Sequence, residues 1–413
     1  MSEKNFDELY RDIIKRKISL EEPLPPVYNP KHLECLLHPE EYAPVIPAEE
    51  CDSCKEAYER ACQNSCIFDA IGTDAKGKLS IHPEKCVGCE ACIKACESGK
   101  LIAAKDVIPA MKAVREKTGK AYVLIAPAFF GQFQEDVTPG KLRKAFRALG
   151  FDGMVEVALF ADILTMKEAL EFDRQIQSQS DFQLTSCCCP IWIAMIRKVY
   201  QELLPHVPGA VSPMIAAGRV IKRLYPDAVT VFVGPCMAKK SEAREEDIAD
   251  AVDYVLTFQE VQDIFDAADI HPEQLCEEEK NHSSKAGRNY AKTGGVSEAV
   301  AETVRQLRPE SRLQVLSEQA DGVSECRKML ERLQHGETTA NFFEGMGCVG
   351  GCVGGPKAIL DRKEGCRQVE RYAEEAVYKT PLENPYVMKM MEWLKLDTVE
   401  ELLEDEELFV RRF

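Results

Sequence analysis

The sequence predicts an α/β fold with largely parallel sheets and flanking helices, joined to a small α+β domain. Apolar runs such as 121–127 (AYVLIAP) and 228–233 (AVTVFV) are typical of strands that are covered on both faces. Helical patterns separate these runs, and this alternation favours parallel pairing between the strands. Eight cysteines crowd into residues 51–96, ahead of the first run. This crowding indicates a small separate domain that is organised around thiols.

Length and charge limit the kinds of protein that this chain can be. A chain of 413 residues exceeds the usual size of one hydrophobic core, so we expect several domains. The net charge of −17 argues against nucleic acid and anionic membrane surfaces as main partners. No run of 18 apolar residues occurs, so we expect no membrane span and, most simply, a cytoplasmic protein. The expected parts are an N-terminal extension, a cysteine-rich domain, a main domain and a helical tail packed on it, at 1–46, 47–105, 106–359 and 360–413.

The secondary structure expected for the main domain alternates along the chain. Helices are expected over 107–118, 141–149, 155–177 and 193–204. Strands are expected at 121–127, 183–185, 228–233, 254–257, 312–316 and 340–343. Among these strands, the one at 312–316 has the weaker pattern.

Cysteine usage points to metal rather than to disulfides. The chain has 18 cysteines, and disulfides are disfavoured in a reducing compartment. Thirteen of the 18 fall into tight groups, as metal ligands do. Clustered thiolates in this chain are therefore interpreted as ligands.

The cysteine-rich domain contains two quasi-repeats. The second has the spacing C-x2-C-x2-C-x3-C, which two-cluster bacterial ferredoxins use, with the fourth cysteine serving the other cluster. The first has seven residues between its second and third cysteines. A pair of zinc sites is the alternative, but zinc ribbons seldom use this spacing, and soft thiolates suit iron–sulfur clusters. By the crossing rule, the two 4Fe–4S clusters of a ferredoxin-like domain would be held by Cys51, Cys54, Cys62 and Cys96, and by Cys86, Cys89, Cys92 and Cys66.

Three further cysteine motifs each follow a predicted strand of the main domain. They are TSCCCPIW at 185–192, GPCMAKKSE at 234–242 and GMGCVGGCVGGP at 345–356. Open α/β sheets bind their ligands at the carboxyl ends of strands, and glycine lets the backbone approach a bulky group closely. The sequence therefore predicts that thiolates from three distant parts of the chain meet at one buried metal centre.

In this order, and after a ferredoxin-like domain, the three motifs closely resemble the signature motifs of the iron-only (FeFe) hydrogenases. The extra cysteine in TSCCCP resembles a divergent branch that is often called group B. The resemblance covers residues 51 to about 356. It implies an H-cluster, which is a 4Fe–4S cubane joined through one cysteine sulfur to a di-iron unit with carbon monoxide, cyanide and an azadithiolate bridge.

Site residues follow from the resemblance. The cubane ligands map onto Cys189, Cys236, Cys348 and Cys352, and Cys352 would bridge to the di-iron unit. Counting back from Pro190 makes Cys189 the ligand and Cys188 the proton-transfer thiol. Counting forward from Thr185 would instead assign these roles to Cys188 and Cys187. We prefer the first assignment, because the Cys-Pro-x-Trp turn into the next helix is harder to alter.

Other side chains resemble residues that surround the family's cofactor. Lys239 can donate a charge-assisted hydrogen bond to an anionic cyanide ligand, and Glu242 at i+3 could pair with it. Met346 resembles the methionine beside the di-iron unit. Pro127 and Ala128 resemble the segment whose backbone meets the other cyanide.

The proton route resembles the family's route only in part. Residues 160–172 resemble the helix with two path glutamates, which would be Glu168 and Glu171, on one helix face. The family's arginine falls at Gln175, and its path serine appears as Pro208. These departures concern the rate and direction of the reaction rather than the cofactor.

The function that the resemblance implies is reversible conversion of 2H+ + 2e− to H2. Electrons would pass through the two 4Fe–4S clusters to or from a soluble carrier such as ferredoxin, and hydrogenase maturation proteins would insert the di-iron unit. Two alternatives remain. One is a hydrogenase-like iron–sulfur assembly factor without the di-iron unit, which would need neither Lys239 nor a free thiol beside the cluster. The other is an H2 sensor.

Overall fold

The computed structural model describes most of the chain. Its description covers residues 4–19, 27–48, 51, 60–75, 78–178, 180–185, 188–278, 281–310, 314–337 and 339–413. No helix within these ranges is both long and apolar enough to cross a membrane.

The larger sheet of the main domain has the strand order β6-β5-β8-β9, and all its pairs are parallel. Its central strands are apolar and buried on both faces, as the sequence predicts. Ile125 at the end of β5 pairs with Val233 near the end of β8, so the loops that follow these two strands begin side by side. The strands are β5 (Ala121–Ile125), β6 (Gly153–Glu156), β8 (Val229–Gly234) and β9 (Tyr254–Thr257).

A second parallel sheet has the order β10-β11-β7. It consists of β7 (Gln183–Leu184), β10 (Ser317–Asp321) and β11 (Phe342–Met346). The strand expected at 312–316 is wrong, because β10 begins only at Ser317; residues 311–313 lie outside the described residues. β10 is an edge strand with a polar sequence and exposed positions, so it lacks the apolar run by which buried strands are recognised.

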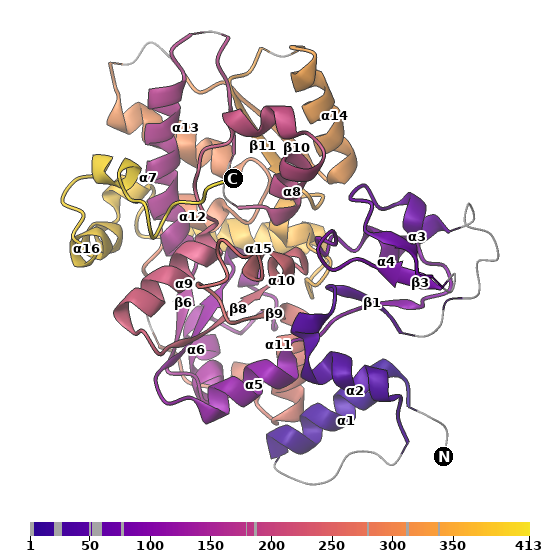
Figure 1. Ribbon diagram of the computed structural model, residues 1–413. Helices are drawn as coiled ribbons and strands as arrows, with labels where there is room; N and C mark the ends of the chain where they lie inside the picture. The colour runs from indigo at the N-terminus through magenta and orange to yellow at the C-terminus, as the bar shows by residue number, and fades with distance from the viewer. Residues whose placement is uncertain are drawn as a thin grey trace.

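Helix α7 (Ala158–Gln175) runs through the middle of the main domain, as Figure 1 shows. It is buried from Ala158 to Phe172, which is typical of a helix that other elements surround. The helices that pack on it include α9 (Pro213–Leu224), α12 (Lys285–Asn289), α13 (Gly295–Leu307) and α16 (Pro385–Trp393). The helix expected over 155–177 begins later than predicted, because residues 153–156 form β6 instead.

Further helices flank the sheets or pack on one another, and the fold class predicted for the main domain, parallel sheets with flanking helices, is confirmed. These helices are α5 (Val107–Glu116), α6 (Pro139–Ala148), α8 (Pro190–Lys198), α10 (Ala238–Ala243), α11 (Phe258–Ala267), α14 (Val323–Gln334) and α15 (Arg362–Glu374). The expected helix over 193–204 starts earlier, at Pro190, and continues after Lys198 as a 3₁₀ turn at Gln201–His206.

The cysteine-rich domain forms a small α+β lobe on one side of the molecule (Figure 1). It contains two antiparallel strand pairs, β1 with β4 and β2 with β3, and two short helices. The expected boundary at residues 46–47 falls inside β1, so the N-terminal extension contributes a strand to this lobe. The elements are β1 (Val45–Pro47), β2 (Ile71–Thr73), β3 (Leu79–Ile81), β4 (Leu101–Ala103), α3 (Ala61–Asn64) and α4 (Ala91–Ala95).

The N-terminal extension otherwise packs on the main domain. Helix α1 (Phe6–Ser19) contacts α11, and α2 (Pro30–Leu37) contacts α5. The extension therefore joins the two lobes, with its helices on one and its strand in the other.

Candidate metal centre

Three loops that follow strands bring four thiols together in the main domain. Cys189 follows β7, Cys236 follows β8, and Cys348 and Cys352 follow β11. The thiols of Cys189, Cys236 and Cys352 lie near enough to Cys348 to raise its pKa. Those of Cys189 and Cys352 raise the pKa of Cys236 in the same way. The backbone N–H of Gly347 donates to the Cys189 sulfur at 3.1 Å.

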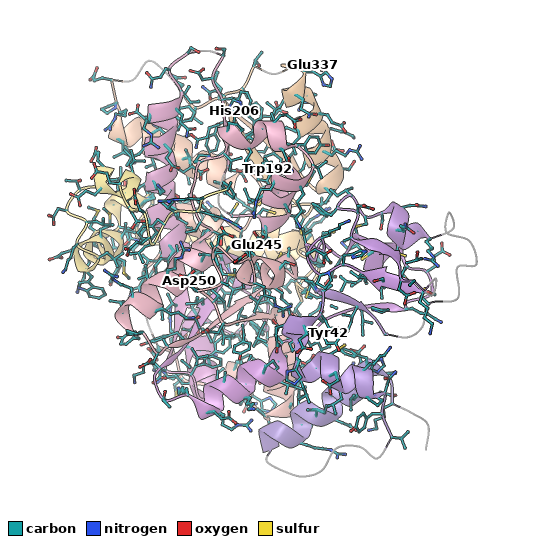
Figure 2. The ribbon with its side chains drawn as sticks, in the orientation of Figure 1. Tyr42, Trp192, His206, Glu245, Asp250 and Glu337 are labelled. Carbon is teal, nitrogen blue, oxygen red and sulfur yellow. The ribbon has the colours of Figure 1, made fainter. Side chains whose placement is uncertain are left out.

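Close backbone approach explains the glycines around these thiols. A Cβ on Gly345 would lie 2.0 Å from the Trp192 ring, and one on Gly347 would lie 2.5 Å from Ile191. The indole of Trp192 in turn donates to the Thr185 carbonyl at 3.1 Å, which closes the turn that contains the triple cysteine. Figure 2 labels Trp192 near the middle of the main domain. Glycine in strand β11 thus lets the loop with Cys348 and Cys352 lie flat against helix α8.

The chemistry of the thiols favours a cluster of metal ions. Burial raises the pKa of Cys236 and Cys348, and it raises that of Cys352 to about 12, with neighbouring thiols adding to each shift. Bound iron would supply the positive charge that deprotonates such thiols. Among the described residues, no three His, Cys, Asp or Glu side chains are placed to hold a single metal ion. A 4Fe–4S cubane would be held by four thiolates, each of them bound to a different iron.

Lys239 lies beside these thiols in helix α10. Its ammonium is buried and pairs with Glu242 at 2.6 Å, one turn along the helix. Burial lowers the pKa of Lys239, but the Glu242 carboxylate and the Cys236 and Cys352 thiols outweigh it, so the net shift is upward. The site therefore holds one buried cation, as recognition of an anionic ligand would require.

A further thiol at this site is that of Cys188, which directly precedes the buried Cys189. Its sulfur lies 4.0 Å from the Met346 sulfur, so two of the residues selected from the sequence meet here. Cys187, the alternative proton-transfer thiol, lies outside the described residues.

The segment with Pro127 and Ala128 lies beside the loop of Cys236. It forms a 3₁₀ turn after β5, and Ala128 is fully buried. The N–H of Ala126 donates to Val233 at 2.8 Å, and a Cβ on Gly234 would lie 3.1 Å from that of Ala126. The structure thus places this segment next to the loop that begins at Gly234.

The two glutamates expected on a proton path, Glu168 and Glu171, are both buried in α7. Glu171 pairs with Lys167 at 3.0 Å, and burial raises its pKa although Lys167 opposes the shift. One Glu171 oxygen has no hydrogen-bond partner among the described residues. The Gln183 amide donates to the Glu168 carbonyl at 3.5 Å, so α7 lies against the strand that leads to the triple cysteine.

The small lobe contains a second group of thiols. Burial raises the pKa of Cys89 to about 11 and of Cys92 to about 12, and the neighbouring thiols of the group add to both shifts. The same thiols line one cavity. This group consists of Cys66, Cys86, Cys89 and Cys92.

The other expected ligands of the small lobe pack in its apolar core beside this group. They are Cys51, Cys62 and Cys96, and the fourth, Cys54, lies outside the described residues. Hydrogen bonds from Ser98 and from nearby backbone outweigh burial and lower the pKa of Cys96. A thiol-lined lobe of this kind fits iron–sulfur clusters.

Two acidic residues near the main-domain thiols were missed in the sequence. Glu344 in β11 is fully buried, accepts from the N–H groups of Gly294 and Ser297 at 2.8 Å each, and has its pKa raised to about 7 by burial. Asp321 accepts from the Gly350 N–H at 2.9 Å, which holds the loop between Cys348 and Cys352. An acidic residue in an otherwise apolar strand is the signal that could have revealed Glu344.

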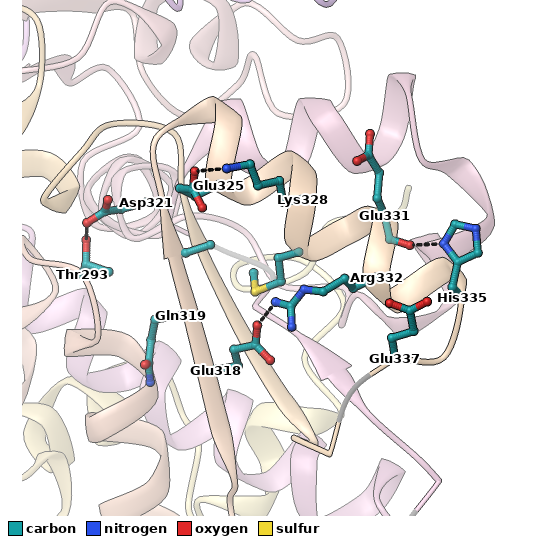
Figure 3. A pocket seen from close by; sticks show the side chains of 12 residues that line it. Thr293, Glu318, Gln319, Asp321, Glu325, Lys328, Glu331, Arg332, His335 and Glu337 are labelled. Atoms are coloured by element: carbon teal, nitrogen blue, oxygen red, sulfur yellow. Dashed lines mark hydrogen bonds and ion pairs between the residues drawn. The ribbon is translucent and has the colours of Figure 1, made fainter.

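A large surface hollow lies between β10 and α14, and no cysteine is among the residues that line it (Figure 3). Its charged groups pair with one another: Lys328 with Glu325 at 2.7 Å, and Arg332 with Glu318. Asp321 at its edge also accepts from Thr293 at 3.0 Å. The hollow therefore borders the loop of Cys348 and Cys352 through Asp321, and the other charged side chains named above are held in ion pairs.

Two groups of clustered thiols on this scaffold are what an iron–sulfur protein requires. Residues 119–356 match the family model "Iron only hydrogenase large subunit, C-terminal domain", and residues 79–99 match "4Fe-4S binding domain". The first match covers more than half of the chain, which therefore belongs to the iron-only hydrogenase large subunit family. The resemblance of the motifs to the iron-only hydrogenases is thereby confirmed, whereas membership of the divergent branch stays a prediction.

Curated relatives include hydrogenases and assembly factors. Iron hydrogenase 1 of Clostridium pasteurianum is 29% identical over 61% of this chain and 50% of that protein. The NADP-reducing hydrogenase subunit HndD of Solidesulfovibrio fructosivorans is 26% identical over 76% and 64%, respectively. A cytosolic Fe-S cluster assembly factor NAR1 homolog of Schizosaccharomyces japonicus is 23% identical over 48% and 46%. The chain thus spans between half and two thirds of the two hydrogenases.

Among solved structures, a variant of the [FeFe]-hydrogenase HydA1 from Chlamydomonas reinhardtii has a similar fold. The TM-score is 0.59 at 20% identity, and the match covers 75% of this chain and 98% of that one. At this identity the likeness concerns the fold.

Proposed function

We propose that the protein is an FeFe hydrogenase that catalyses 2H+ + 2e− ⇌ H2. The observation that carries this proposal is the meeting of four ligand thiols with a buried lysine and a further thiol at one place. Cys189, Cys236, Cys348 and Cys352 would hold the cubane of an H-cluster, with Cys352 bridging to the di-iron unit. When bound, this group supplies the low-valent metal pair at which hydrogen is made or split.

The surrounding side chains would then bind, orient and supply protons. Lys239, which Glu242 keeps in place, would donate to an anionic ligand of the di-iron unit, and the backbone after Pro127 and Ala128 would donate to another. Met346 would close the wall beside Cys188. Burial in this wall excludes bulk water, which strengthens the interactions of Lys239.

Proton supply is proposed to use Cys188, Glu168 and Glu171. Cys188 would exchange a proton with the site, and the two buried carboxyls of α7 would connect it toward the surface. The unpartnered oxygen of Glu171 and the raised pKa of its carboxyl support this role. The proton route would differ from that of the wider family at two positions, because Gln175 stands where the family has an arginine and Pro208 where it has a serine.

Electrons are proposed to pass through two 4Fe–4S clusters in the small lobe, exchanged with a soluble carrier such as ferredoxin. The cluster nearer the main domain would be held by the four clustered thiols of Cys66, Cys86, Cys89 and Cys92. The other would use Cys51, Cys54, Cys62 and Cys96. We further propose that maturation proteins insert the di-iron unit. The expected division of the chain into four parts is also proposed, with β1 of the N-terminal extension counted with the small lobe.

A role as an iron–sulfur assembly factor is the second candidate, because the NAR1 homologues are also relatives. Such a protein would need thiols for cubanes alone. The buried Lys239–Glu242 pair and the contact between Cys188 and Met346 favour the hydrogenase instead, since neither would serve a cubane alone.

Infrared spectroscopy distinguishes the two candidates. The chain is produced together with hydrogenase maturation proteins, or loaded with a synthetic di-iron complex, and its carbonyl and cyanide stretching bands are recorded beside H2 evolution from reduced methyl viologen. A hydrogenase shows both the bands and the gas. Bound iron without these bands after maturation would contradict the proposal and favour the assembly factor, whereas bands without turnover would favour the sensor.

A further inference from the structure

One residue of the main domain touches the loops of both thiol groups. The backbone N–H of Lys357 donates to the Pro235 carbonyl at 3.0 Å, and Pro235 directly precedes Cys236. The Lys357 ammonium lies 3.1 Å from a carboxylate oxygen of Glu90, and Glu90 directly follows Cys89. Lys357 therefore spans the gap between a main-domain ligand loop and a small-lobe ligand loop.

The interface around Lys357 is closely packed. Gly88 has φ +71°, and a Cβ there would lie 3.0 Å from the carbonyl oxygen of Met237, the residue after Cys236. The Ser241 hydroxyl donates to the Cys86 carbonyl at 3.0 Å. Lys94 in α4 acts electrostatically on Cys348 across the same interface. The two thiol groups thus face each other across a thin protein layer.

The two charged side chains of this ion pair differ in their exposure to solvent. The Glu90 side chain is 4% exposed and that of Lys357 is 20% exposed. A buried carboxylate without its partner is costly, and its charge acts strongly on neighbours at short range. Lys357 is thus the cation that offsets a buried negative charge one residue from Cys89. A redox centre beside an offset charge accepts an electron more readily than one beside a bare carboxylate.

We propose that Lys357 is a positioning residue for electron transfer, which holds the Cys89 loop against the Cys236 loop and, by offsetting Glu90, raises the reduction potential of the cluster bound there. The inference rests on the proposed iron–sulfur sites. In the step concerned, one electron leaves the small-lobe cluster and enters the main-domain cubane, or moves in reverse. The first is oxidised and the second reduced, and the soluble carrier is the electron source or acceptor.

A structural ion pair alone would hold the lobes together without this effect on potential. The two roles separate in a charge series. Lys357→Gln leaves Glu90 uncompensated, Glu90→Gln leaves the lysine charge, and the double variant removes both. Lys357→Arg keeps the charge. Lys389→Gln on α16 is the matched control, since Lys389 is exposed and α16 lies on the side of the molecule away from the small lobe (Figure 1).

The full chain is reconstituted with iron and sulfide only, without the di-iron unit, and its clusters are titrated against potential by electron paramagnetic resonance. For the small-lobe cluster that Cys89 would help to hold, we expect a lower midpoint potential in Lys357→Gln and a higher one in Glu90→Gln. The double variant and Lys357→Arg should return close to the parent value, and Lys389→Gln should not differ from it.

Two outcomes would overturn the inference. One is a midpoint potential in Lys357→Gln equal to that in Lys389→Gln. The other is a midpoint potential that falls by the same amount in Lys357→Gln and in Lys357→Arg. Because arginine keeps the positive charge, this result would show that the shift comes from loosened packing and not from charge. A parent chain that binds no cubane iron would remove the proposed function itself, and iron analysis recognises that failure separately.

Discussion

The two thiol groups of this protein are assembled in opposite ways. In the small lobe, Cys86, Cys89 and Cys92 lie on one short segment, and only Cys66 comes from outside it. In the main domain, the thiols come from three loops, and two separate parallel sheets must be in place before they meet. A local group can be recognised from spacing alone, whereas a dispersed group depends on the packing of the whole domain. The dispersed group therefore has more ways to fail.

Removing one dispersed ligand should have the largest effect. We expect Cys236→Ser to lose the main-domain cubane, about four irons per chain, and all H2 turnover, because three thiols hold a cubane poorly. Cys89→Ser should lose a similar amount of iron from the small lobe but keep the carbonyl and cyanide bands of the main domain. Iron analysis and infrared spectra measure both. Cys276→Ser, at an exposed position, is the control; equal loss of bands in all three variants would refute the contrast.

Cys188→Ala should reduce turnover without removing the cofactor. Loss of a proton-transfer group costs about 10²–10⁴-fold in rate. Iron content and infrared bands should stay those of the parent, which distinguishes this thiol from the ligand Cys189. H2 evolution at saturating reductant measures the effect. Unchanged turnover would assign the role to Cys187 instead.

Glu168→Gln should slow proton supply by up to about 10²-fold, again with unchanged clusters. The variant keeps the size of the side chain but cannot ionise. Turnover and its solvent isotope effect are the measurements. Glu325→Gln, in the exposed pair with Lys328, is the matched control. A rate equal to that of the control would show that protons reach the site by another path.

The smallest effect concerns the scaffold of the main domain. Asp162 in α7 is fully buried, accepts from Ser284 and Asn384, and has its pKa raised by burial from 3.8 to about 6. Because the unfolded chain ionises first as pH rises, stability should fall between about pH 3.8 and 6, by about 3 kcal/mol in total. Asp162→Asn should flatten this part of the profile.

Denaturant unfolding of the metal-free chain between pH 4 and 7 tests this prediction. The slope against pH is compared rather than the absolute stability, since asparagine also alters the hydrogen bonds to Ser284 and Asn384. Unfolding of the small lobe should be the same in both chains. Parallel profiles for the parent and the variant would contradict the prediction.

The sequence predicted the parallel sheets and the order of the motifs, because buried strands and cysteine spacing leave local patterns. It missed what depends on distant partners. β10 is polar and was expected five residues too early, since only its pairing with β11 makes it a strand. The glycines around Cys348 were expected to let the backbone approach a bulky group, but the need for Gly345 and Gly347 comes from Trp192 and Ile191 on α8. The pair of Lys357 and Glu90 joins residues that no local pattern connects.

The position of β11 near the end of the main domain has a consequence for biosynthesis. The strands of the small lobe are complete once residue 103 has left the ribosome, but Cys352, the last thiol of the main-domain group, emerges much later. At ordinary translation speeds this delay is on the order of 10–50 s. The small-lobe thiols are therefore exposed on the nascent chain well before the main-domain group is complete, and a cluster at the main-domain group must wait until Cys352 has emerged.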